Sequence, residues 1–190
     1  MTKEDLRTLY KQKRMALSAE GCAERDRLIF EELVALDWST CRYVHVYLPL
    51  HKFNEPDTLA FASWIRQHYP YVKLVISRSD FMSGTMLNYV WDEHTIIEEN
   101  KWGIPEPMAG TQVDEKLIDT VLVPLLVADK QGNRVGYGKG FYDRFLAQCK
   151  PDVRTIGLSY FEPLNDTLNA DSWDIPLQYC VCPSGFYTFT

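Results

Sequence analysis

The chain lacks any long apolar run. Nowhere among its 190 residues is there a stretch close to the roughly 18 apolar residues that a membrane-spanning helix needs. The first residues carry charge from Lys3 onward, which is not the pattern of a secretory signal peptide. We therefore expect no membrane association and a cytoplasmic location.

Basic charge is also in short supply. The chain has 20 Lys and Arg residues against 26 Asp and Glu residues, which gives a formal net charge of −6. Proteins that bind nucleic acids in general usually present a broad basic field. We therefore expect no nucleic-acid partner, and basic charge here is local.

Cysteine is scarce and scattered. The odd number of five does not suggest a disulfide framework, and Cys180-x-Cys182 has no second pair at the spacing of a zinc site. The alternation over residues 178–183 predicts a strand in which these thiols serve as small apolar groups. We expect reduced thiols.

What the chain does contain is typical of a folded globular protein. Apolar residues make up 46% of it and aromatic residues 13%. A chain of this length can bury a substantial core as one domain. We expect one domain over residues 1–190, and a monomer.

Apolar periodicity predicts helices and strands in alternation. Helices are expected over 3–17, from the break at 18–21 to about 36, after Thr58, and over 141–149. Strands are expected over 43–48, 72–76, 86–91, 120–124 and 155–158, and residues 100–119 look loop-rich. This order predicts an α/β fold with a mainly parallel sheet and helices on both faces. Ligands bind such sheets at the carboxyl ends of the strands.

The most informative segment is the glycine-rich loop GNRVGYGKGFYDR, residues 132–144. It lies between a predicted strand and a predicted helix, and it mixes four glycines with Arg134, Lys139 and Arg144. Glycine lets the backbone approach a ligand closely, and N–H groups at a helix start bind anions. The spacing is neither that of a Walker A loop nor that of a dinucleotide fingerprint. We favour a phosphate site over a surface loop that uses glycine only for turns.

The first helix and the segment after the first strand add candidate ligand-binding side chains. Lys3, Arg7, Lys11 and Arg14 recur at helical spacing, as either a solvated basic face or a set of phosphate contacts. Glu55 should lie at the ligand end of the sheet, where it could bind a polar ligand. The neighbouring Asp57 or Thr58 is expected to cap the next helix, and His45 is expected to be structural.

Trp102 and two aspartates complete the candidates. Trp102 either anchors a packed loop or stacks on a flat heterocycle. Asp143 and Asp174 could bind magnesium, which uses only one or two protein carboxylates when nucleotide phosphates and water complete its shell. Asp174 could equally be a turn residue.

Taken in order, these segments resemble the 5-formyltetrahydrofolate cyclo-ligase family, also called methenyltetrahydrofolate synthetases. The similarity runs through nearly the whole chain and is most specific in the glycine loop. The matching motifs are Lys3-x-x-Leu6-Arg7, NEPDT at 54–58, WGIPEP at 102–107, NRVGYGKGFYD at 133–143 and WDIP at 173–176.

The resemblance implies an ATP- and Mg²⁺-dependent conversion of 5-formyltetrahydrofolate to 5,10-methenyltetrahydrofolate, with release of ADP and phosphate. In that chemistry the formyl oxygen attacks the γ-phosphate, N10 of the folate closes the ring, and phosphate departs. The resemblance also implies a three-layer α/β fold, related in outline to ribose-phosphate isomerases and coenzyme A transferases.

The resemblance also assigns roles to residues. ATP would be bound by Lys3, Arg7, Arg134, Val135, Gly136, Tyr137, Gly138, Lys139, Gly140, Phe141 and Tyr142. Lys139 and Arg134 would be catalytic, because they would stabilise the transferred charge. Magnesium would be bound by Asp143 and Asp174, and the folate by Leu50, Glu55, Trp102 and Phe141.

Two departures from the family pattern affect these roles. Phe141 stands where many members have Tyr, so a hydroxyl contact to substrate is missing while ring stacking remains. Lys139 stands where glycine is common. Two other functions stay open on the residues alone: a sugar-phosphate isomerase with Glu55 as its base, and a non-catalytic module that binds folate or nucleotide.

Overall fold

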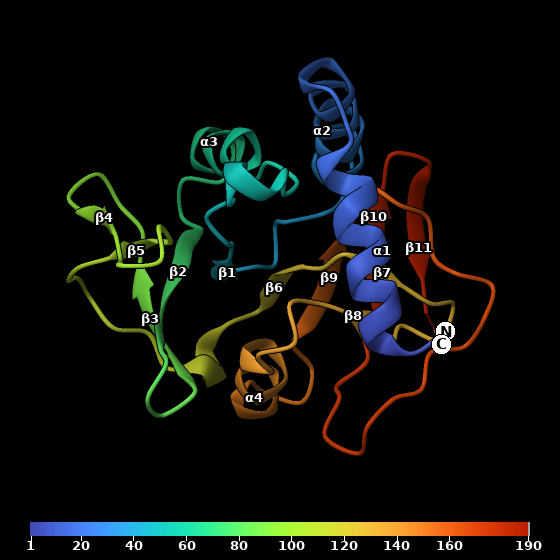
Figure 1. Ribbon diagram of the computed structural model, residues 1–190. Coiled ribbons are helices and arrows are strands. Elements are labelled where there is room, and N and C mark those ends of the chain that lie inside the picture. Colours follow the sequence, from blue (N-terminus) through green and yellow to red (C-terminus); the bar gives the residue numbers. More distant parts are fainter. Residues whose placement is uncertain (190) are drawn as a thin grey trace.

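The computed structural model describes residues 1–189 and is built around a seven-stranded sheet (Figure 1). Across the sheet the strands are β11 (Gly185–Thr188), β10 (Tyr179–Cys182), β9 (Arg154–Leu158), β6 (Thr120–Pro124), β1 (Tyr43–His45), β2 (Lys73–Asp80) and β3 (Thr85–Val90). The five inner strands pair in parallel, and β11 and β3 pair antiparallel at the two edges. The predicted α/β fold with a mainly parallel sheet is confirmed.

Helices cover both faces of the sheet, as predicted. The helices are α1 (Lys3–Met15), α2 (Ala19–Val34), α3 (Leu59–His68) and α4 (Phe141–Gln148). Helices α2 and α3 lie on one face and α4 on the other (Figure 1). None of the helices in residues 1–189 is long and apolar enough to cross a membrane.

Strand β6 shows how the sequence produces this layering. Leu122 belongs to the core that includes Ile29 of α2, whereas Val121 and Val123 belong to the core that includes Phe145 of α4. Successive side chains of a strand point to opposite faces, so β6 is buried on both sides. This double burial explains its unbroken apolar sequence.

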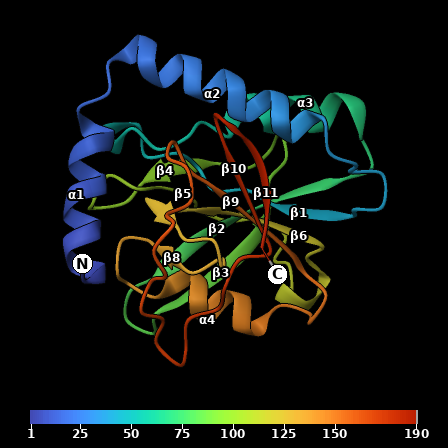
Figure 2. The ribbon, with the colours of Figure 1, turned by 90° about the vertical axis from the view of Figure 1, so that its right-hand side faces the viewer.

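Helix α1 lies outside these two covering layers (Figure 2). Its N-terminus has a capping box, in which Thr2 Oγ1 accepts from the Asp5 N–H and Asp5 accepts from the Thr2 N–H. The helix packs against β8 (Arg134–Val135) and the 3-10 helix η1 (His51–Phe53). These segments follow β6 and β1 in the chain, so α1 lies at the carboxyl edge of the parallel strands.

The short elements were not predicted. They are β4 (Ile97–Glu99), β5 (Pro105–Pro107), β7 (Val127–Ala128), β8, η1, η2 (Glu115–Leu117) and the edge strand β11. Except for β11, the strands in this set have two or three residues and are too short to show a period of two, which is the signal for a strand. The predicted helix ends at 17 and 36 also extend about two residues too far, as helix ends commonly do.

Two local predictions are resolved. Thr58 is the N-cap residue of α3, but its side chain makes no capping bond, and it is Asp57 Oδ1 that accepts from the Leu59 N–H at 2.8 Å. The Thr58 hydroxyl instead donates to the Tyr47 carbonyl at 2.6 Å. Cys180 and Cys182 lie buried in β10, which confirms the predicted strand, and all five cysteines are free thiols.

Candidate active site

A cleft of about 910 Å³ opens at the carboxyl edge of the sheet. Of the residues predicted to bind nucleotide, metal or folate, all but one line it: Lys3, Arg7, Leu50, Glu55, Trp102, Arg134, Gly136, Tyr137, Gly138, Lys139, Gly140, Phe141, Tyr142, Asp143 and Asp174. The exception is Val135, which is 1% exposed and packs with Leu6 and Tyr10 of α1. Its carbonyl accepts from the Leu126 N–H at 2.8 Å, so Val135 anchors the loop beneath the cleft.

The glycine loop at residues 136–140 owes its shape to left-handed backbone conformations. Gly138 has a φ of 82° and Gly140 a φ of 68°, values that glycine adopts readily and other residues do not. A Cβ on Gly138 would also lie 2.9 Å from the Arg7 guanidinium carbon. Because Gly140 is the N-cap of α4, the free N–H groups of that helix start at the cleft.

Cationic side chains hold the loop and leave one charge free. Arg7 Nε donates to the Gly136 carbonyl at 2.9 Å. Arg144 donates to the Lys139 carbonyl at 2.8 Å and to the Gly84 carbonyl, which ties the loop to the β2–β3 hairpin. The Lys139 side chain is exposed and forms no ion pair with any residue of 1–189. Its ammonium is therefore available to an incoming anion.

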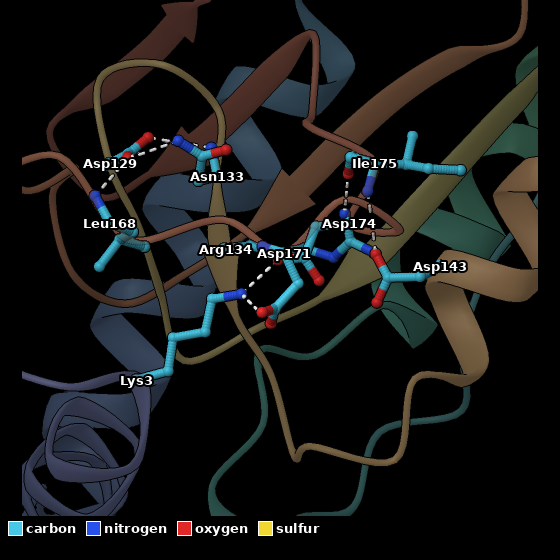
Figure 3. Close-up of polar contacts among 9 residues, drawn as sticks. All are labelled: Lys3, Asp129, Asn133, Arg134, Asp143, Leu168, Asp171, Asp174 and Ile175. Atoms are coloured by element: carbon cyan, nitrogen blue, oxygen red, sulfur yellow. Dashed lines mark hydrogen bonds and ion pairs between the residues drawn. The ribbon is translucent and has the colours of Figure 1, made fainter.

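Arg134 and Asp143 close the loop from either end. Arg134 Nη2 donates to Asp143 Oδ1 at 2.6 Å, and the same oxygen accepts from the Ile175 N–H at 3.1 Å. The other Nη of Arg134 donates to the Ile175 carbonyl (Figure 3). Burial lowers the pKa of Arg134, and the charges of Asp143 and Asp174 oppose that effect. The Arg134 guanidinium thus already donates hydrogen bonds to the Asp143 carboxylate and to the Ile175 backbone.

Lys3 joins the first turn of α1 to the segment before Ile175. Its Nζ donates to Asp171 at 3.1 Å and also to Asp174 (Figure 3). The Asp171 N–H donates to Asp174 at 2.7 Å. Burial raises the pKa of Asp174, but the bonds from Lys3 and from the Asp171 N–H, together with the charges of Lys3 and Arg134, outweigh it and hold that pKa below its ordinary value. The same contacts raise the pKa of Lys3 against the opposing effect of burial.

Asp143 and Asp174 are the candidate ligands for a divalent cation. Within residues 1–189 no three His, Cys, Asp or Glu side chains gather as a metal site. However, Asp143 Oδ2 and Asp174 Oδ1 accept no hydrogen bond from the described part of the chain. Each carboxylate therefore keeps one oxygen for a cation, and Arg134 interacts with both groups. Two hard oxygen donors fit Mg²⁺ when phosphates and water supply the rest of its shell.

Glu55 is the buried carboxylate of the cleft. It is 5% exposed. Its Oε2 accepts from the Leu50 N–H at 2.7 Å, and its Oε1 accepts from the Tyr137 hydroxyl at 2.5 Å. Burial raises the pKa of Glu55, and these two bonds oppose that rise. Glu55 and Leu50 are thus held together, and Tyr137 links them to the glycine loop.

Aromatic rings form an apolar wall of the same cleft. The Phe81 ring centre lies 4.2 Å from that of Trp102 and 5.1 Å from that of Phe141. Lys52 donates to the Trp102 carbonyl at 2.5 Å, which fixes the turn that carries the indole. Trp102 is 47% exposed, so its ring has surface left for a ligand. Such a wall suits a flat ring system.

His45 lies among polar groups at the floor of the cleft. Its Nε2 is 2.7 Å from the Ser77 hydroxyl, which donates to Asn88 Oδ1 at 2.7 Å. Asn88 in turn donates to Glu115 at 2.9 Å. Burial lowers the pKa of His45 to about 3, so the imidazole is neutral at physiological pH. These contacts agree with the predicted structural role of His45.

Several cleft residues were not predicted from the sequence. They include Tyr47, Lys52, Phe53, Ser77, Ser79, Phe81, Met86, Asp171 and Trp173. A signal existed for two of them, because Ser77 and Ser79 interrupt β2 where it leaves its apolar half. Phe81 had no comparable signal, since only the hairpin after β2 brings it to Trp102.

Comparison with known proteins connects this cleft to a family. A model of the 5-formyltetrahydrofolate cyclo-ligase family matches residues 1–183. The chain is 31% identical over 189 residues to the 5-formyltetrahydrofolate cyclo-ligase of Mycoplasma pneumoniae, a match that covers 95% of this chain and 98% of the relative. It is 25% identical over 185 residues to that of Mus musculus, with 93% of this chain and 91% of the relative covered.

Solved structures share the fold. The NMR structure of Aquifex aeolicus 5,10-methenyltetrahydrofolate synthetase matches with a TM-score of 0.80 at 27% identity, over 99% of this chain and 93% of that one. The 5,10-methenyltetrahydrofolate synthetase of Mycoplasma pneumoniae matches with a TM-score of 0.77 at 24% identity, over 95% of this chain and 98% of that one. With its motifs, its fold and its family match in agreement, the chain belongs to the 5-formyltetrahydrofolate cyclo-ligase family.

Proposed function

We propose that this chain converts 5-formyltetrahydrofolate to 5,10-methenyltetrahydrofolate, with ATP and Mg²⁺ as co-reactants and ADP and phosphate as products. One observation carries the proposal: the residues that the family motifs assign to nucleotide, metal and folate line a single cleft, except Val135. The names of the relatives support the same substrate and product.

The glycine loop and α1 form the nucleotide half of the cleft. We infer that the backbone N–H groups of residues 136–140 and the start of α4 receive the phosphates. Lys139 supplies a free charge, and Lys3 and Arg7 approach from α1. Arg134 holds Asp143 and the Ile175 backbone in place, so we expect it to stabilise the transferred charge largely by fixing the carboxylate.

Asp143 and Asp174 are the proposed magnesium ligands. A bound Mg²⁺ neutralises charge on the phosphate oxygens that it contacts. In this structure Lys3 pairs with Asp174, so that carboxylate must release Lys3 to offer both of its oxygens. Asp171 already contacts the same ammonium and can retain it.

Glu55 and the aromatic wall form the proposed folate half. We expect buried Glu55 to accept hydrogen bonds from the pterin ring, beside the Leu50 backbone that it fixes. Phe141 and Trp102 present rings for stacking against the folate. Without a hydroxyl, Phe141 contributes packing alone.

The proposed chemistry needs alignment more than a protein nucleophile. The formyl oxygen attacks the γ-phosphorus and the bond to the leaving ADP oxygen breaks. N10 then attacks the activated formyl carbon, phosphate leaves with the formyl oxygen, and N10 loses its proton. The chain contributes by holding the folate against the glycine loop and by placing Lys139 where negative charge develops.

We also propose the setting in which this reaction occurs. Residues 1–190 would form one cyclo-ligase domain, with Thr190 outside the described residues. We expect the domain to act as a monomer in the cytoplasm, without a nucleic-acid or membrane partner. The net charge of −6 supports the absence of a nucleic-acid role.

A direct assay tests the function. Purified chain is mixed with 5-formyltetrahydrofolate, ATP and Mg²⁺, and the methenyl product is followed by absorbance while ADP is measured separately. We expect one ADP per methenyl product and no product when ATP is omitted. Tight folate binding without product would support a binding module instead, and ATP-independent isomerisation of a sugar phosphate would support the isomerase alternative.

A further inference from the structure

Arg14 carries a buried charge for which the roles above give no reason. The side chain is 1% exposed, and no ion pair joins it to any residue in the described range 1–189. One Nη lies 3.5 Å from the Leu125 carbonyl, and the other donates to the Tyr137 hydroxyl. A buried charge is costly unless its surroundings compensate it.

The compensation runs through Tyr137. Its hydroxyl accepts from Arg14 and lies 2.5 Å from Glu55 Oε1. A guanidinium can only donate, and a phenol has a single proton. Arg14 therefore forces the Tyr137 proton toward Glu55. The Arg14 cation, the Tyr137 phenol and the Glu55 carboxylate thus form one directed series of hydrogen bonds.

Contacts with the backbone fix both ends of this hydrogen-bond series, Arg14 and Glu55. The Arg14 carbonyl accepts from Asn54 Nδ2 at 3.1 Å, which joins the end of α1 to the residue before Glu55. Glu55 itself accepts from the Leu50 N–H at 2.7 Å. Neither Arg14 nor Glu55 can therefore move without disturbing the segment that carries Glu55.

We propose that Arg14 is a positioning residue that orients Tyr137 and Glu55 and so joins the nucleotide half of the cleft to the folate half. Arg14 does not line the cleft, so it acts through Tyr137. The identity of the two ligands rests on the proposed function. Tyr137 belongs to the loop that would receive the phosphates, so a bound nucleotide would stabilise the loop conformation in which Tyr137 donates to Glu55, and each ligand would strengthen the binding of the other.

The test is calorimetric titration of 5-formyltetrahydrofolate with and without a non-hydrolysable ATP analogue and Mg²⁺. In the wild-type chain we expect the analogue to tighten folate binding about five-fold or more. In Tyr137→Phe, which keeps the ring, folate binding should weaken about ten-fold, and the effect of the analogue should disappear.

Variants of Arg14 separate charge from packing. Arg14→Met should behave like Tyr137→Phe, whereas Arg14→Lys, which keeps a charged donor, should restore part of the effect of the analogue. Lys13→Met removes a charge from an exposed position one residue away and should bind both ligands like the wild type. If Arg14→Met fails to fold, Tyr137→Phe and Arg14→Lys still decide the matter.

The outcomes distinguish this inference from the proposed function. The inference would be overturned if the analogue tightened folate binding in both Tyr137→Phe and Arg14→Lys as much as it does in the wild type. This would hold even if the wild-type chain forms product. If the wild type forms no product but Tyr137→Phe shows the expected losses, the function fails and the positioning role stands. A wild-type chain that binds no 5-formyltetrahydrofolate would overturn both.

Discussion

Arg134 and Asp143 lie at opposite ends of the glycine loop and meet at 2.6 Å. The pair closes the segment between β8 and α4 into a ring, and Ile175 is bonded to both partners. Contacts within the chain therefore hold the two ends of the loop in place. This supports a site whose backbone N–H groups need little rearrangement to receive phosphates.

Asp143→Asn should lower turnover strongly. The change keeps the shape of the side chain but removes the charge that faces Arg134 and the proposed Mg²⁺. We expect a loss on the order of a hundred-fold in kcat/KM for ATP, with partial recovery at high Mg²⁺. Steady-state kinetics across a magnesium series measure both effects.

The matched control for that variant is Asp166→Asn, which removes an exposed carboxylate with no hydrogen bond to any described residue. It should retain wild-type kinetics. Unchanged kinetics in Asp143→Asn itself would remove Asp143 from the site.

Glu55→Gln should act mainly on the folate. The amide can still accept from the Leu50 N–H, but it loses the charge that a pterin donor would meet. We expect KM for 5-formyltetrahydrofolate to rise about ten-fold, as for one hydrogen bond to a charged group, while the affinity for ATP in the absence of folate changes little. A defect confined to ATP would contradict the placement of Glu55.

Gly138→Ala should damage the loop. The φ of 82° is unfavourable for alanine, at a cost of about 1–2 kcal/mol, and the new Cβ would press on the Arg7 guanidinium. We expect reduced ATP affinity and lower unfolding free energy, measured by nucleotide titration and chemical denaturation. Gly136→Ala is the stability control, since a Cβ there meets no atom within 4 Å; an equal loss of stability in both variants would contradict the argument.

His45→Gln should reduce acid sensitivity. Burial lowers the pKa of His45 to about 3, against about 6.5 when unfolded, so the unfolded chain binds the extra proton. The contribution of neutral His45 to the free energy of unfolding is fully present above the unfolded pKa. It is lost as the pH falls from about 6.5 toward about 3. Proton linkage predicts that His45 lowers the free energy of unfolding of the wild type at pH 5 by about 2 kcal/mol relative to pH 8.

Denaturant titrations of wild type and His45→Gln at pH 5 and pH 8 measure that difference. Wild type should lose about 2 kcal/mol more than the variant between the two conditions. Equal losses would show that His45 is protonated, or exposed, in the folded chain.

The sequence was sufficient for the layered fold and for most residues that gather at the cleft. The apolar run of β6 and the glycines before α4 are local signals with a direct structural meaning. The pairing of Arg134 with Asp143 and of Lys3 with Asp171 and Asp174 could not be predicted, because it depends on where the chain returns after β9.

The basic face predicted on α1 shows the same limit. Lys3 and Arg7 reach the cleft and Arg14 is buried behind it, but Lys11 lies exposed over the Phe53 ring. Helical spacing placed these residues on related faces, and it did not indicate which of them would be buried. That depended on the packing of α1 against β8 and η1.

The most direct test is a crystal structure with a non-hydrolysable ATP analogue, Mg²⁺ and 5-formyltetrahydrofolate. We predict the polyphosphate against the N–H groups of residues 136–140, with the ion between it and Asp143. A polyphosphate bound elsewhere, with this loop packed as a plain connection between β8 and α4, would contradict the account.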